Sequence, residues 1–429
     1  MHNNEIYVSL DIGTSTVKVI IGEMENDSLN IIGVGNAASE GLKKGQIVDI
    51  DETVKSIRKA VEQAERMVGM EIRKVIVGIS ANHVMLQPCH GVVAVSNENR
   101  EITEEDKIRV REQAELVTIP ADREIIDVIP VHYRVDEIDE ISDPKGMTGV
   151  RLEMRGVLIT GLRTILHNTL RAVERAGLEI TDIALQPMAA GSLVLSKDER
   201  NLGIALVDIG GGSTSVAVFE DGELKGASVI PLGGNNITKD ISIVLKTPTD
   251  VSEQIKVRHG HAFIDDDAEE ETFTIPVIGT EKQQTCNQFI VSDIMEDRLT
   301  EIFEMVEDAI AKMGVTDLLG GYVLTGGVVK TPGILDLAQN ILQNRVRGAQ
   351  PNYIGVREPQ YTTSVGLITY ACNKARSQGV KLGSHTVASA KETTEKRPVH
   401  KSAPKEKAPK NPEDKMSTKM KKFFGVFFE

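Results

Sequence analysis

Two short runs of the sequence place a carboxylate, glycines and hydroxyl residues where one apolar run ends and the next begins. They are residues 11–16, DIGTST, and residues 208–214, DIGGGST. Glycine lets the chain turn sharply and leaves backbone amides open to an anion, and such amides bind phosphate oxygens. Either run alone is more often an ordinary hairpin turn. Its occurrence in two similar segments favours a pair of phosphate-binding turns.

The two runs supply matching sets of candidate residues. We expect Asp11 and Asp208 on the metal side, where a carboxylate holds Mg²⁺ through water because this ion gives up its water reluctantly. Lys18, on the strand after the first turn, is expected to reach the same anion, and the amides of residues 13–15 are expected to point into one space. The phosphate contacts are expected from Gly13, Thr14, Ser15 and Thr16 in the first run and from Gly210, Gly211, Gly212, Ser213 and Thr214 in the second.

A third run, residues 320–333 (GGYVLTGGVVKTPG), adds a surface for a planar group. Its apolar stretch predicts a buried strand that ends in the pair Gly326 and Gly327, where a flat ligand could lie against bare backbone. Pro332 is expected to start the helix that follows, because proline suits the first helical position.

The elements around these runs repeat. Strands are predicted at residues 6–10 and 17–21 around the first run and at 202–207 and 215–219 around the second. A helix at 51–67, with Asp49 or Asp51 as its cap, follows the first pair. This repetition indicates a duplicated α/β domain.

The stretch after residue 81 differs, because it alternates short β-like runs with one charged helix near residues 103–116, so we interpret it as an α+β insert. The predicted first lobe therefore comprises residues 1–81 and 156–200, with an inserted subdomain at 82–155. The second lobe comprises residues 201–231 and 315–376, with an outer subdomain at 232–314. A proline- and lysine-rich linker is predicted at 377–414, before a terminal segment at 415–429.

Composition excludes several classes of protein. The chain has 429 residues, 49 basic against 63 acidic, and a formal charge of −14, which argues against general affinity for nucleic acid. The widely spaced Cys89, Cys286 and Cys372 form neither a metal-ligand pair nor an even disulfide framework, so a reducing, cytosolic compartment is the simplest interpretation. No run of about 18 apolar residues indicates a membrane-spanning helix, and the N-terminus lacks the pattern of a signal peptide.

The last fifteen residues are predicted to form an amphipathic helix. Although the whole chain is acidic, residues 377–429 carry a formal charge of +6. At 100° per residue the apolar side chains share an arc of about 140°, apart from Val426, which suits a helix lying in a membrane interface. Packing on the protein's own core and docking into a partner's groove are the alternatives. The membrane-facing candidates are Met416, Met420, Phe423, Phe424, Phe427 and Phe428, flanked by Lys419, Lys421 and Lys422.

With its three glycine-rich runs in this order, the chain resembles the actin, sugar-kinase and heat-shock-chaperone ATPase superfamily. Two connecting segments of that superfamily resemble residues 186–191 and 361–367. The resemblance implies an α/β, actin-like fold of two ribonuclease-H-like lobes that binds ATP with Mg²⁺ in the cleft between them. It assigns Gln186 to positioning the attacking water, together with Asp11 and Asp208, and it suggests Asn236 and Lys239 as contacts to ribose and base.

The insert, the linker and the amphipathic end make the whole chain resemble the FtsA family of bacterial cell division proteins. That resemblance implies a protein that forms filaments, binds the tubulin-like protein FtsZ and tethers it to the cytoplasmic face of the membrane at the division septum. The FtsZ C-terminal peptide would dock on the outer subdomain, where Arg298 and Glu301 match the family's Arg-Leu-x-Glu helix. An ordinary surface pair at i and i+3 is the alternative for these two residues.

Two other functions share the same cleft. A small-molecule kinase would need an acceptor pocket with a carboxylate base, which we do not identify in the sequence. An actin-like component of pilus assembly would need neither the terminal helix nor FtsZ. Whether ATP is hydrolysed stays open, with slow hydrolysis as the upper expectation.

Overall fold

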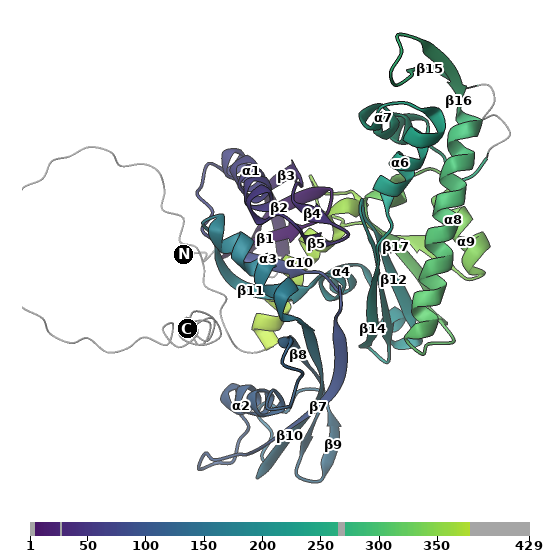
Figure 1. Ribbon diagram of the computed structural model, residues 1–429. Helices are drawn as coiled ribbons and strands as arrows, with labels where there is room; N and C mark the ends of the chain where they lie inside the picture. The colour runs from purple at the N-terminus through teal and green to yellow at the C-terminus, as the bar shows by residue number, and fades with distance from the viewer. Residues whose placement is uncertain (1–4, 26–27, 265–270, 378–429) are drawn as a thin grey trace, which may run out of the picture. The chain divides into compact units, whose positions relative to one another are not determined.

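The computed structural model describes residues 5–25, 28–264 and 271–377 (Figure 1). It contains two five-stranded sheets with the same order, in which three antiparallel strands are followed by two parallel ones. This correspondence confirms the predicted duplication and the two-lobed α/β architecture. In sheet order, the strands of the first lobe are β11 (Glu179–Leu185), β6 (Lys74–Ile79), β1 (Glu5–Ile12), β2 (Thr16–Glu25) and β3 (Ser28–Ala38). The corresponding strands of the second lobe are β18 (Val346–Gly348), β17 (Gly321–Thr325), β12 (Ile204–Ile209), β13 (Thr214–Glu220) and β14 (Glu223–Ile230).

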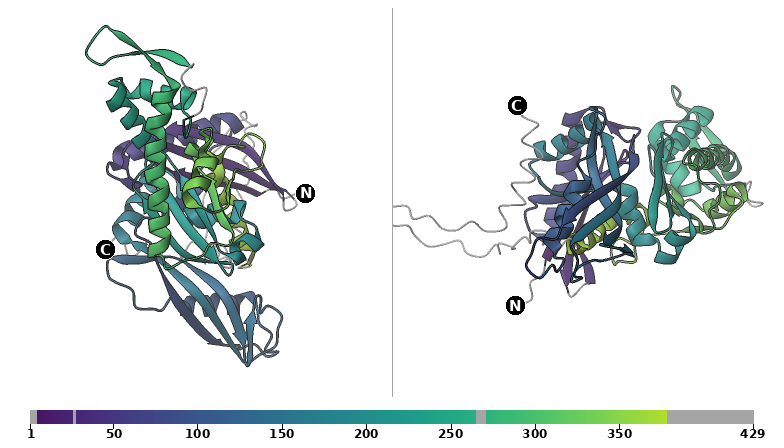
Figure 2. Two further views of the ribbon diagram at one scale, coloured as in Figure 1. Left: turned by 90° about the vertical axis from the view of Figure 1, so that its right-hand side faces the viewer. Right: turned by 90° about the horizontal axis from the view of Figure 1, so that it is seen from below.

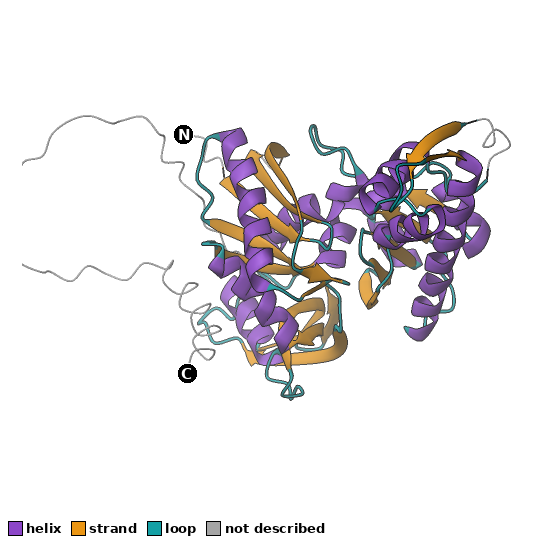
Figure 3. Cartoon of the chain, turned by 45° about the horizontal axis from the view of Figure 1, so that its top comes forward, coloured by secondary structure: helices purple, strands orange, loops and turns teal. Residues whose placement is uncertain are grey.

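Helices cover both faces of the first sheet, so its central strands are apolar nearly throughout. α1 (Ile50–Val68) packs against β3 and lies beside α3 (Arg163–Arg175) on one face (Figure 3). α10 (Thr362–Ser377) packs against β1 on the other face and also contacts α4 (Gln186–Val194). The predicted cap of α1 is Asp49, whose side chain accepts from the Glu52 amide, and the helix ends at Gly69 in a left-handed conformation.

The insert is a four-stranded sheet with one helix, which agrees with the α+β insert that the sequence predicts. Its helix α2 (Glu104–Ala114) starts at Thr103 with a capping box and packs on β7 and β10. The contact is close, because a Cβ atom at Gly91 would lie 2.0 Å from the Val110 carbonyl oxygen. In sheet order the strands are β7 (Met85–Ala94), β10 (Arg151–Leu162), β8 (Arg123–Val135) and β9 (Ile138–Ile141).

The second lobe carries an outer group of elements joined to its sheet by a long helix, α8 (Gln288–Lys312), which runs the length of that lobe (Figure 2). A single apolar core, with Phe303 fully buried, unites these helices with the sheet. The other elements of this lobe are α5 (Lys197–Leu202), α6 (Gly234–Leu245), α7 (Thr249–His259), β15 (Thr272–Pro276), β16 (Gln283–Asn287), the 3₁₀ turns η1 (Gly327–Lys330) and η2 (Pro359–Tyr361), and α9 (Ile334–Leu342).

Two local features differ from or add to the expectations. Pro332 does not start a helix: η1 precedes it, and α9 begins only after Gly333, whose φ of 77° breaks the helical path. In the first lobe a two-residue turn at Lys44 and Gly45 joins β4 (Leu42–Lys43) to β5 (Gln46–Ile47).

Within the described part of the chain, no helix combines the length and the apolar character needed to cross a membrane.

Candidate functional site

The two predicted phosphate-binding runs form equivalent loops at the ends of equivalent hairpins. The first loop, residues 13–15, joins β1 to β2, and the second loop, residues 210–213, joins β12 to β13. Each is closed by the same bond: the Gly13 amide donates to the Thr16 carbonyl (3.1 Å), and the Gly210 amide donates to the Ser213 carbonyl (3.0 Å). The Gly13 amide therefore does not point into the shared space, contrary to the expectation, because closing the turn consumes it.

The two loops touch each other across the lobes. A Cβ atom added at Gly211 would lie 1.9 Å from Ser15 Oγ, and one added at Gly212 would lie 2.4 Å from Thr14 Cγ2. Ser15 Oγ also donates to Asn235 Oδ1 (3.1 Å) at the start of α6. A side chain at Gly211 or Gly212 would therefore collide with the first loop.

Asp11 lies at the centre of the site on the first-lobe side. Its side chain is nearly buried and accepts hydrogen bonds from Gln186 Nε2 (2.8 Å) and Ser364 Oγ (3.0 Å), and Lys18 Nζ lies 3.6 Å from its Oδ2 atom. Gln186 is the first residue of α4, and Ser364 belongs to the first turn of α10. The structure thus brings together three residues that the sequence singled out from separate segments, namely Asp11, Lys18 and Gln186.

Asp208 occupies the matching position in the second lobe. Thr363 Oγ1 donates to its Oδ2 atom (3.0 Å), so neighbouring residues of α10 serve the two carboxylates. Burial raises the pKa of Asp208, with the Lys18 ammonium opposing the rise and the Asp11 carboxylate adding to it. Beside it lies a cavity of about 20 Å³, which is enough for one water molecule. The cavity is lined by Gln186, Pro187, Ala190, Leu206, Asp208, Ser215 and Thr363.

The predicted double glycine packs against the second loop. Gly326 has a φ of 96°, and a Cβ atom there would lie 2.4 Å from Asp208 Oδ1 and 2.5 Å from the Ile209 carbonyl oxygen. The space in front of Gly327 is open by comparison, since the nearest atom to an added Cβ is Gln360 Cβ at 4.0 Å. Of the two glycines, Gly326 is therefore needed for close packing, whereas Gly327 offers bare backbone to a ligand.

The two residues expected near ribose and base take different positions. Asn236 Oδ1 accepts from the Gly233 amide (3.1 Å) and so caps α6, whereas Lys239 is exposed on that helix. The sequence reasoning missed Lys256, whose Nζ atom donates to the Gly234 carbonyl (3.1 Å) and to Thr238 Oγ1 (2.8 Å).

Lys256 also pairs with Glu253 (2.6 Å), one turn earlier on α7. The spacing of these two charges, i and i+3, was visible in the sequence and would have placed both on one helix face. An added Cβ at Gly234 would lie 2.9 Å from Val328 and 3.4 Å from Lys256 Nζ, so α7 and the η1 turn meet at the start of α6.

The candidate partner-binding pair lies on α8. Arg298 donates to Glu301 and, through Nε, to Asp240 Oδ2 on α6 (2.7 Å). The hydrogen bond and charge of Asp240 raise the pKa of Arg298. We define the α6–α8 face as Asp240, Arg298 and Glu301 together with the exposed apolar residues Ile243, Val244 and Ile290. Ile243 and Val244 lie on the same face of α6 as Asp240, and Ile290 lies on the same face of α8 as Arg298, as their helical spacing requires.

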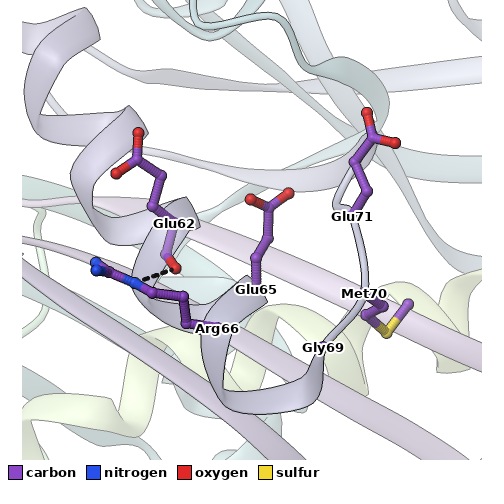
Figure 4. Close-up of a pocket in the computed structure, with 6 residues that line it drawn as sticks. All are labelled: Glu62, Glu65, Arg66, Gly69, Met70 and Glu71. Atoms are coloured by element: carbon purple, nitrogen blue, oxygen red, sulfur yellow. Dashed lines mark hydrogen bonds between the residues drawn. The ribbon is translucent and has the colours of Figure 1, made fainter. Parts of the chain in front are cut away.

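A hollow elsewhere on the first lobe is chemically unlike the loops. It has a volume of about 400 Å³ and lies where α1 ends and the chain turns toward β6 (Figure 4). Three of its six lining residues are glutamates and only one is basic, so an anionic ligand would be repelled. The lining residues are Glu62, Glu65, Arg66, Gly69, Met70 and Glu71.

The predicted membrane-facing residues of the terminal segment, from Met416 to Phe428, lie outside the described residues.

Comparison with known proteins gives matches along the chain. A family model described as "Cell division protein FtsA" matches residues 205–366, and one described as "SHS2 domain inserted in FTSA" matches residues 81–160, the region of the insert. The cell division protein FtsA of Bacillus subtilis (strain 168) is 62% identical over 383 residues, covering 89% of this chain and 87% of the relative. The cell division protein FtsA of Enterococcus hirae is 38% identical over 442 residues, covering all of both chains.

A solved structure titled "PilM-PilN type IV pilus biogenesis complex" matches with a TM-score of 0.59 and 16% identity, over 85% of this chain and 98% of that one. At this identity the likeness concerns the fold alone, which is that of the actin-like ATPases. It therefore adds nothing in favour of a role in pilus assembly.

Proposed function

Since the chain belongs to the FtsA family of cell division proteins, we propose that it is an ATP-binding scaffold that forms filaments and tethers the FtsZ ring to the cytoplasmic face of the membrane at the division septum. The observation that carries the nucleotide part is the meeting of two duplicated loops above Asp11, Asp208 and Gln186. The parts that concern FtsZ and the membrane rest on the family and on the chemistry described below.

The triphosphate of ATP would lie between the two loops. Thr14, Ser15 and Ser213 offer hydroxyls there, and Lys18 offers the cation nearest to Asp11. Because the loops touch, the lobes must separate before a polyphosphate can enter. Binding of ATP is therefore coupled to a change in the distance between the lobes, which gives a filament-forming protein a way to sense its nucleotide.

Mg²⁺ fits the second-lobe side of this site. Asp208 is a desolvated carboxylate that faces Ser215 across the strand pair rather than a lysine. Asp11 and Asp208 would hold the ion, which when bound offsets phosphate charge. The chain's own residues would orient it, since Thr363 and Ser364 fix the two carboxylates from α10.

Gln186 has the position of a residue that orients water. Its Nε2 atom donates to Asp11, which leaves its carbonyl oxygen to accept a hydrogen bond from a water in the adjoining cavity. We assign it this positioning role in slow hydrolysis. The adenosine part of ATP would lie along Gly327 and the start of α6, with Lys256 and Glu253 at its edge.

The α6–α8 face suits the C-terminal peptide of FtsZ. Apolar side chains of Ile243, Val244 and Ile290 are exposed on it, 62%, 56% and 40% respectively, beside the charged group of Asp240, Arg298 and Glu301. An apolar strip bounded by charges binds a short amphipathic segment. Arg298 would have to share its existing partners with the peptide, so the apolar residues would supply most of the affinity.

The terminal segment supplies the membrane attachment in this proposal. Four phenylalanines in the last seven residues, next to lysines, suit an anionic membrane surface. Changing Phe424 and Phe427 to Glu should release the full chain from anionic liposomes in a sedimentation assay. A matched change of Phe263 in the outer subdomain should leave liposome binding intact, and equal binding by all three proteins would contradict the attachment.

The proposal as a whole is tested by equilibrium binding of MgATP to the full chain, followed by FtsZ C-terminal peptide. We expect Asp208→Ala to weaken MgATP binding and Val244→Glu to weaken peptide binding, with each change leaving the other ligand unaffected. A wild-type chain that binds neither MgATP nor the peptide would refute the proposal.

A further inference from the structure

The turn between β4 and β5, formed by Lys44 and Gly45, lies against the phosphate-binding loops of both lobes. The Gly45 amide donates to Thr14 Oγ1 in the first loop (3.1 Å). A Cβ atom added at Gly45 would lie 3.6 Å from Ser213 Oγ in the second loop. These contacts join segments that are far apart in the sequence, and they make the turn a third neighbour of the space where phosphates would bind.

The turn is held from the side as well. Asn82 Nδ2 donates to the carbonyl oxygens of Lys44 (3.3 Å) and Gly45 (3.2 Å). Asn82 lies between β6 and β7 and is the first residue of the insert. Because the Gly45 amide and both carbonyl groups of the turn are engaged, the turn has little freedom of its own and the Lys44 backbone is held relative to the first loop.

The residue type at position 44 is unexpected for this backbone. Lys44 and Gly45 both have positive φ, 52° and 74°, as in the two-residue hairpin turns that prefer Asn-Gly or Asp-Gly. The β13–β14 hairpin of the same chain follows that preference, with Asp221 and Gly222 at φ of 53° and 79°. A lysine in a left-handed conformation is strained where Asn or Asp would not be. Such an outlier beside a functional site points to a role for the side chain.

The charge of Lys44 is also available. Its side chain is exposed, and with the other described residues it makes no ion pair and no side-chain hydrogen bond. Lys18 is differently placed, because Asp11 lies 3.6 Å from its ammonium. A polyphosphate that entered between the loops would bring several negative charges to a site where Lys18 is already shared.

We propose that the Lys44 turn is a third element of the anion site, in which the Lys44 ammonium binds the phosphates of a nucleoside polyphosphate at the mouth between the two loops. This inference rests on the proposed nucleotide binding and adds a residue to it. The Thr14 hydroxyl links the two parts, since it accepts from Gly45 and can still donate its own hydrogen to a phosphate oxygen. Anion binding would thus pull on the turn, and through Asn82 on the start of the insert.

The test compares two variants, each of which removes one lysine charge at a different position. Lys44→Asn gives the turn the residue it structurally prefers, and Lys59→Gln removes an exposed lysine from α1. In calorimetric titrations of the full chain we expect Lys44→Asn to weaken MgATP binding about tenfold, as loss of a hydrogen bond to a charged group does. Adenosine binding should be unchanged, and the thermal midpoint should be equal to or above that of the wild type. Lys59→Gln should bind both ligands normally.

The outcomes separate this inference from the proposed function. If the wild type binds MgATP and Lys44→Asn binds it equally well, Lys44 is only a turn residue and the assignment is wrong. If Lys44→Asn weakens adenosine as much as MgATP, the turn shapes the pocket instead of binding phosphate, and the assignment is again wrong. If the wild type binds no nucleotide, the proposed function fails first, and this inference fails with it.

Discussion

The first and second loops have the same architecture but differ in the residue that faces their carboxylates. Both follow an Asp-Ile pair, both are closed by the same backbone bond, and both carboxylates accept a hydrogen bond from a hydroxyl of α10. Across the strand pair, however, Asp11 faces Lys18 whereas Asp208 faces Ser215. The two hairpins therefore share one backbone arrangement, and they differ in the side chain that faces the carboxylate across the strand pair. The first carboxylate is paired with the Lys18 ammonium at 3.6 Å, whereas the second has no ion pair among the described residues, and the more distant Lys18 charge only partly opposes the rise of its pKa.

The largest effect should come from removing the lysine that makes the loops different. Lys18→Met leaves the buried Asp11 carboxylate without its cation, so we expect a loss of about 3 kcal/mol in the free energy of unfolding at neutral pH. Chemical denaturation of the full chain measures this. Ser215→Ala, at the register-equivalent position in the second hairpin, is the control and should cost much less. Equal losses from the two variants would mean that the loops do not differ in charge compensation.

The comparison also separates what the sequence could predict from what it could not. The repeated Asp-Ile-Gly identified both loops, the duplicated lobes and Asp208, because those features depend on local pattern. The contact between Ser15 and Gly211 could not be predicted, since it depends on how the lobes meet and on atoms from distant segments. The hydrogen bond that the Gly13 amide makes within its own turn could not be predicted either, because a pattern of glycines does not show which amides are already bonded.

Long-range pairing limited the prediction of other residues in the same way. Arg298 was chosen for its spacing from Glu301, yet its hydrogen bond to Asp240 comes from a different helix. Lys256 was missed although its i, i+3 partner Glu253 was readable, because its contact to Gly234 depends on the packing of α7 on α6. Local patterns fixed the elements, and tertiary packing decided which of their side chains meet.

A smaller effect should distinguish the two hydroxyls that α10 provides. Ser364 donates to Asp11 and Thr363 donates to Asp208 at the same distance, 3.0 Å. Because the cavity beside Asp208 has room for a water that can replace a lost donor, whereas Ser364 is fully buried against Asp11, we expect Ser364→Ala to cost about 2 kcal/mol and Thr363→Val about 1 kcal/mol. Thermal and chemical unfolding at neutral pH measure both. A larger loss from Thr363→Val would contradict this difference between the two carboxylate sites.

The smallest effect has the opposite sign and depends on pH. Since burial raises the pKa of Asp208, its folded form holds a proton more tightly than the unfolded chain does, whose aspartates titrate near about 3.9. Below that pH the group is protonated in both states and costs nothing. As the pH rises, the unfolded state loses its proton first, so stability falls until the folded pKa is passed. Asp208→Asn removes this cost and should raise the free energy of unfolding of the ligand-free chain by about 1 kcal/mol at neutral pH.

Asp208→Asn should gain no stability at pH values below the unfolded pKa. It should also bind MgATP more weakly, because the carboxylate that destabilises the free protein is the one a metal would need. Denaturation curves at several pH values, together with MgATP titrations, measure the two sides of this exchange. Asp221→Asn, at an exposed turn of the same lobe, is the control and should change neither. A destabilised Asp208→Asn at neutral pH would show that the Lys18 charge compensates the second carboxylate as fully as the first, and the two loops would then be electrostatically alike.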